Sequence, residues 1–119
     1  MSRSSQVASH RKQQQAINAF LEKLLAAYKT NIIKVYLFGS QARGEVQRDS
    51  DIDILVIAAQ SDWRLKHQIS HIAADIGLEY DVLIDSHIVQ ESRWQEIGEA
   101  GYRFYKNVMD DGVSLVAAS

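Results

Sequence analysis

VYLFGSQARGEVQRDSDIDILVI, residues 35–57 of the 119-residue chain, joins two apolar runs through a polar segment. The runs are rich in β-branched residues, which predicts buried strands over 32–38 and 51–57. The second run carries Asp51 and Asp53, whose side chains share one face of a strand because residues i and i+2 point the same way. Two carboxylates about 4 Å apart repel by roughly 4 kcal/mol at an effective dielectric near 20, which protonation or a cation relieves. A divalent metal, which prefers hard oxygen ligands, is one such cation.

The turn after the first strand indicates which kind of site the two carboxylates belong to. Gly39 lets a phosphate approach the backbone, and the Ser40 hydroxyl and nearby N–H groups can donate to phosphate oxygens. A Gly-Ser turn is common by itself, but here Asp-x-Asp follows ten residues later in a strand–turn–strand context. That combination predicts a phosphate and metal site. Arg43, Arg48 and Ser50 are further candidate phosphate contacts, and for each arginine the alternative is a solvated loop residue.

The remaining chain alternates helical and strand patterns. Apolar residues at helical spacing predict an amphipathic helix over 17–28, and a second helix capped by Asp62. LEYDVLI, residues 78–84, predicts a third strand, and helical segments with a short edge strand at 113–116 follow it. We therefore expect a single α/β domain over residues 1–119, a small mixed sheet with flanking helices.

Composition narrows the classes of protein further. Apolar residues make up 46% and charged residues 24%, which is typical of a globular domain. The net charge of −2 gives no electrostatic attraction to nucleic acid, so no direct nucleic-acid binding is expected. The chain has no cysteine, and no segment has the length of apolar sequence that a signal peptide or a membrane span needs. We expect a cytoplasmic protein with no membrane contact.

The segment LFGSQARGEVQRDSDIDILV, residues 37–56, resembles the signature of the DNA polymerase β-like nucleotidyltransferases. It is most similar to their minimal nucleotidyltransferase (MNT) group, and the resemblance fits the chain from Ile17 to Leu115. It implies a polymerase β-like fold and a Mg²⁺-dependent transfer of a nucleotide from a nucleoside triphosphate. A two-metal site suits this reaction because two ions can stabilise both the attacking and the departing oxygens.

The resemblance also assigns roles to individual residues. Gly39 and Ser40 would grip the triphosphate of ATP, while Asp51 and Asp53 would bind two Mg²⁺ ions. A third carboxylate should lie on the following strand, within EYDVLID, residues 79–85.

Two residues of that segment are candidates for the third carboxylate. Asp81 matches the family position, where it would be a metal ligand and could accept a proton from the nucleophile. Asp85 lies on the same face of the expected strand and is the alternative third carboxylate. Its other possible role is that of a turn or cap residue at the end of the strand.

The acceptor of the nucleotide is expected to be a protein. From its length and charge we expect neither an acceptor domain nor a basic groove in this chain. Similar MNT proteins pair with HEPN-domain ribonucleases as antitoxin and toxin. The resemblance thus implies a HEPN-type partner whose tyrosine receives AMP. Two alternatives remain open: a non-catalytic module that neutralises its partner by binding, and a nucleotidyltransferase acting on a small molecule.

Overall fold

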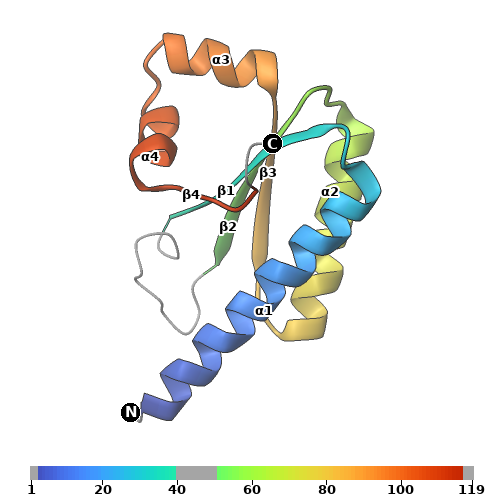
Figure 1. Ribbon diagram of the computed structural model, residues 1–119, viewed down its shortest axis with the longest axis vertical. Coiled ribbons are helices and arrows are strands. Elements are labelled where there is room, and N and C mark those ends of the chain that lie inside the picture. Colours follow the sequence, from blue (N-terminus) through green and yellow to red (C-terminus); the bar gives the residue numbers. More distant parts are fainter. Residues whose placement is uncertain (1–2, 40–50, 117–119) are drawn as a thin grey trace.

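The computed structural model describes residues 3–39 and 51–116, which form four helices and four strands (Figure 1). The elements are α1 (Arg3–Tyr28), β1 (Ile32–Phe38), β2 (Ile52–Ala58), α2 (Trp63–Tyr80), β3 (Ile84–Gln90), α3 (Glu91–Glu99), α4 (Arg103–Asp111) and β4 (Val113–Ser114). The predicted α/β class with a small mixed sheet is confirmed. Among the described residues, no helix is both long and apolar enough to cross a membrane.

The four strands form one mixed sheet in the order β3-β2-β1-β4. β1 and β2 are antiparallel, and Phe38 at the end of β1 faces Asp53 near the start of β2. β3 runs parallel to β2, in a register that places Asp85 beside Asp53. The short edge strand expected in 113–116 is present as β4, which pairs with β1. The ends of three strands therefore meet around Asp53.

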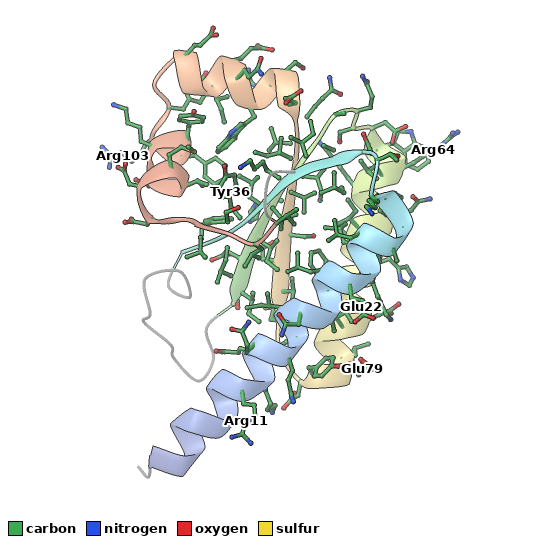
Figure 2. The ribbon with its side chains drawn as sticks, in the orientation of Figure 1. Arg11, Glu22, Tyr36, Arg64, Glu79 and Arg103 are labelled. Carbon is green, nitrogen blue, oxygen red and sulfur yellow. The ribbon has the colours of Figure 1, made fainter. Side chains whose placement is uncertain are left out.

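Helices cover both faces of the sheet, as Figure 1 shows. α1 and α2 pack on one face, where Phe20 and Ile69 are fully buried against β-branched residues of the strands. α3 and α4 pack on the other face, around Trp94 and Leu55. Tyr36, labelled in Figure 2, lies on this second side with its ring centroid 6.5 Å from that of Trp94. The sheet is the central layer of three.

α2 has the N-cap that the sequence predicts, but its C-terminal end extends into the segment where a strand was expected. The Asp62 carboxylate accepts a hydrogen bond from the Leu65 N–H at 2.9 Å. At its other end the helix stops at Asp81, whose φ of 56° and ψ of 51° are left-handed. A Cβ atom on Gly77 would lie 2.7 Å from the Val82 carbonyl oxygen, so this turn requires glycine at residue 77.

The prediction of a third strand over 78–84 is wrong. Residues 78–80 belong to α2, and β3 begins only at Ile84. The helical stripe that buries Ile69, Ala73 and Ile76 continues to Tyr80, which packs against the same core. Leu78, which an inward strand position would bury, is 85% exposed. Helical burial thus determined the local structure where the alternating pattern suggested a strand.

Candidate functional site

Asp53 and Asp85 lie side by side on the two parallel strands β2 and β3. Alternate residues of β2 separate the two faces, so Ile52 and Ile54 are buried beneath α1 and α2 while Asp53 points to the α3/α4 side. Asp85 follows the same alternation on β3, because Ile84 packs against the α1/α2 core. Two carboxylates are thus held on one face by the strand register.

His87 joins these carboxylates. One ligand atom from each of Asp53, Asp85 and His87 lies within 4.8 Å of the others, which makes this group, hereafter the β2/β3 cluster, a possible metal site. The His87 Nε2 is 3.3 Å from Asp85 Oδ2. The imidazole ring lies 5.4 Å from Phe38 of β1 and 6.4 Å from Phe104 of α4, between centroids. Sequence reasoning missed His87, although its i+2 spacing from Asp85 places both on one face.

The electrostatics of the β2/β3 cluster favour binding of a cation. Burial raises the pKa of Asp53 above its usual value of 3.8, and the Asp85 carboxylate raises it further. His87 lowers that pKa, and the Asp51 carboxylate adds a smaller increase. Crowded, partly desolvated carboxylates gain stability from a divalent ion, and carboxylate oxygens are the ligands that Mg²⁺ prefers. The donor set therefore fits a hard divalent metal.

Gly39 closes the cluster from the β1 side. Its φ is +75°, and a Cβ atom added to it would lie 2.6 Å from Asp53 Oδ2. Such a contact is shorter than real Cβ atoms make, and most side chains avoid this φ as well. The backbone of residue 39 therefore reaches the carboxylate directly, with no side chain between them.

Asp51 is exposed and directly precedes β2, one residue short of the strand. The neighbouring Ile52 N–H donates a 2.8 Å hydrogen bond to the Leu83 carbonyl, which ties the start of β2 to β3. Asp51 is close enough to affect the pKa of Asp53 but is not a member of the β2/β3 cluster.

Asp81, expected on a strand facing the metal, occupies a different position. As the C-cap of α2 it is followed by two residues before β3 begins at Ile84. Its carboxylate is 93% exposed and forms a 3.3 Å ion pair with Lys12 of α1. Asp85 is the acidic residue of 79–85 that the structure places beside Asp53. The other candidate contacts, Ser40, Arg43, Arg48 and Ser50, lie outside the described residues.

A groove of about 620 Å³ runs along the free edge of β3, beside the C-terminal half of α2. Its lining includes Ala74, Gly77, Leu78, Asp81, Leu83 and Asp85. Leu78 and Leu83 are 85% and 62% exposed, and Glu79, labelled in Figure 2, lies on α2 at the same end of the molecule. Asp85 lines the groove as well, but its carboxylate belongs to the β2/β3 cluster on the α3/α4 side of the sheet, so the groove and the candidate metal site meet only at the free edge of β3.

The chain is similar to known nucleotidyltransferases in sequence. A family model described as "Polymerase beta, Nucleotidyltransferase" matches residues 20–116. MJ0604 of Methanocaldococcus jannaschii, provisionally named a protein adenylyltransferase, is 31% identical over 100 residues, covering 84% of this chain and 94% of that protein. The protein adenylyltransferase MntA of Shewanella oneidensis is 30% identical over 103 residues, covering 79% of this chain and 70% of MntA.

A solved structure extends the similarity to the fold. A chain of the complex between the tri-AMPylated HEPN toxin of Shewanella oneidensis and an MNT antitoxin superposes with a TM-score of 0.53. The superposition covers 89% of this chain and 72% of that chain at 20% identity, so it compares folds alone. The family match, in contrast, extends from α1 to the residues after β4 and includes every strand of the sheet. The chain therefore belongs to the polymerase beta family of nucleotidyltransferases and is an enzyme.

Proposed function

We propose that the chain is a Mg²⁺-dependent protein adenylyltransferase that moves AMP from ATP to a tyrosine hydroxyl of a HEPN-type toxin and thereby acts as its antitoxin. The observation that carries the proposal is the β2/β3 cluster, in which Asp53 and Asp85 lie side by side and Asp53 contacts Gly39 at the end of β1. Membership of the nucleotidyltransferase family supports the reaction class. The relatives named protein adenylyltransferases support AMP and a protein acceptor.

Asp53 and Asp85 are the proposed metal ligands of the cluster, with Asp51 as a further ligand from the start of β2. When bound, Mg²⁺ would supply positive charge to phosphate oxygens and to the attacking oxygen. Asp85 takes the role of third carboxylate that sequence reasoning gave first to Asp81, because Asp85 is paired with Asp53 in the strand register. Gly39 would leave room for the triphosphate, and the family pattern adds Ser40 as a phosphate donor.

The reaction requires a proton acceptor and a positioned nucleophile. A bond forms between the tyrosine oxygen and the α-phosphorus of ATP, the bond from that phosphorus to the bridging oxygen breaks, and pyrophosphate leaves. The hydroxyl proton has to be removed, and a carboxylate oxygen of Asp85 on the half-exposed side of the cluster is the proposed acceptor. Asp53, which is less exposed than Asp85, would serve as a ligand only, whereas the two oxygens of Asp85 would serve as ligand and as proton acceptor.

The groove beside β3 supports a macromolecular acceptor. Exposed Leu78 and Leu83 offer apolar contact area of the kind that protein interfaces bury. A partner that docks here and extends around the free edge of β3 would bring a hydroxyl to the β2/β3 cluster, next to Asp85.

The direct test is transfer of labelled AMP in a defined mixture. The purified chain, isotopically labelled ATP, Mg²⁺ and a HEPN-domain ribonuclease from the same organism are incubated, and the label is located by peptide mass spectrometry. We expect label on a tyrosine of the partner with the native chain and with Asp75→Asn, an exposed α2 variant away from the cluster. We expect no label with Asp53→Asn.

The alternative functions give different results in the same experiment. A partner that is inhibited without label, and equally by Asp53→Asn, would replace this proposal with neutralisation by binding. Label that appears on a small molecule of a cell extract, and not on the partner, would identify a small-molecule acceptor instead.

A further inference from the structure

We propose that His87 supplies an imidazole nitrogen to the cation held by Asp53 and Asp85, so that this site binds Mn²⁺ more tightly than Mg²⁺. The inference rests on the proposed function, because it concerns the same metal site. Carboxylates and water suit Mg²⁺ and Mn²⁺ alike, whereas imidazole suits transition metals. A nitrogen donor added to the carboxylates therefore shifts the preference away from Mg²⁺ and towards Mn²⁺. His87 is therefore a residue that would determine metal specificity.

The geometry of the three donors is close to that of a metal site. Their ligand atoms lie within 4.8 Å of one another. Ligands about 2.1 Å from an octahedral ion lie about 3.0 Å apart when adjacent and about 4.2 Å apart when opposite. The His87 Nε2 and Asp85 Oδ2 are already 3.3 Å apart. The limit of 4.8 Å for the three donors exceeds the spacing of opposite ligands by only about 0.6 Å, a difference that side-chain rotation can close.

Aromatic packing holds the His87 ring at the cluster. Phe38 meets the ring edge to face at a centroid distance of 5.4 Å and an interplanar angle of 61°. Phe104, which packs on Phe38 at 5.5 Å, lies on the ring's α4 side at 6.4 Å. The imidazole is therefore oriented by two elements besides its own strand, as preorganised metal ligands are.

A simple ion pair with Asp85 is a weaker explanation for this placement. Both side chains are half exposed, at 40% and 54%, and exposed ion pairs contribute little to stability. The chain contains a matched example on α2, where His71 Nδ1 lies 3.4 Å from Asp75 Oδ2. Among the described residues, that pair has no further carboxylate to complete a metal site, whereas His87 has Asp53. His71 is therefore the natural control.

The test measures Mn²⁺ binding by electron paramagnetic resonance, without substrate turnover. Pulsed measurements on protein-bound Mn²⁺ should show coupling to the ¹⁴N of a histidine, and labelling the histidines with ¹⁵N should change that coupling without any mutation. His87→Gln, which keeps an oxygen donor near the position of Nε2, should lose the coupling, and His71→Gln should keep it. Titration with protein lowers the signal of free hexaaquo Mn²⁺, which gives the affinity for Mn²⁺. Competition with added Mg²⁺ then gives the affinity for Mg²⁺.

We expect His87→Gln to lower the preference for Mn²⁺ over Mg²⁺ at least about tenfold, the scale on which even partners of metal ligands act. Bound Mn²⁺ without nitrogen coupling in the native chain would overturn the role of His87 and leave the adenylyltransferase proposal intact. Nitrogen coupling that persists in His87→Gln would also overturn the role of His87, because another histidine would then be the metal ligand. Absence of any Mn²⁺ or Mg²⁺ binding would overturn the metal site of the proposed function as well. Circular dichroism of each variant checks that it is folded.

Discussion

Gly39 and Asp53 are in such close contact that a Cβ atom at residue 39 would lie 2.6 Å from Asp53 Oδ2. The two residues come from the end of β1 and the start of β2, so this contact joins the candidate phosphate turn to the candidate metal ligand. Glycine is required here for two separate reasons, its φ of +75° and the position of the carboxylate.

Gly39→Ala should therefore abolish AMP transfer and lower stability. The left-handed backbone alone costs about 1–2 kcal/mol for a residue with a Cβ atom, and displacement of the Asp53 carboxylate adds to it. Gly101→Ala is the matched control, because Gly101 also has a φ of +75° and a Cβ atom there would meet nothing within 4 Å. Urea unfolding and a transfer assay compare the two variants. Equal transfer by both would show that the contact with Asp53 is unimportant.

Asp53→Asn should lower transfer more than about 100-fold, since even changes behind metal ligands cost 10–100-fold in affinity or activity. The same variant should stabilise the metal-free fold at neutral pH, because burial and the Asp85 carboxylate disfavour the Asp53 anion. A transfer assay and urea unfolding without divalent ions measure the two effects.

The stabilisation by Asp53→Asn should depend on pH in a defined direction. The folded-state pKa of Asp53 lies above 3.8, so between that pKa and 3.8 the folded native chain binds more protons than the unfolded chain. The native chain therefore gains stability as pH falls through this window, and the advantage of the variant shrinks. An advantage that grows towards low pH would contradict the raised pKa.

Asp85→Asn should eliminate transfer, whereas Asp81→Asn should retain it. Asp85 belongs to the β2/β3 cluster, while Asp81 caps α2 and pairs with Lys12 at the surface. Asparagine tolerates the left-handed conformation of residue 81, so this variant removes the charge without straining the cap. Each variant is compared with the native chain in the transfer assay. The reverse result, an active Asp85→Asn and an inactive Asp81→Asn, would restore the assignment made from the sequence.

The sequence is sufficient for those parts of the molecule in which local pattern and burial agree. β1 covers 32–38 as predicted, and Asp62 caps α2 through a side-chain hydrogen bond, because a buried strand and a cap are local features. The pattern that resembles the nucleotidyltransferase family is also local, because it lies within the single segment 37–56.

The third carboxylate and His87 depend on information that no local pattern contains. Residues 78–80 alternate like a strand, yet Tyr80 packs into the helical core, and this moves β3 to Ile84. The neighbours of Asp53 are then fixed by the register between two parallel strands, whose pairing is set by the crossover through α2. A one-residue change of that register would turn Asp85 and His87 to the opposite face.

Mg²⁺ and ATP should stabilise the protein together by more than the sum of their separate effects. The proposed ion contacts both the carboxylates of the β2/β3 cluster and the phosphates, so each ligand completes the binding site of the other, and binding to the folded state raises its stability. Thermal unfolding with neither ligand, with each alone and with both measures this coupling. Asp53→Asn should lose the coupled part of the shift, and Asp75→Asn, on the exposed side of α2, should keep it. A combined shift equal to the sum in the native chain would mean that nucleotide and metal bind independently, which contradicts a shared site at Asp53.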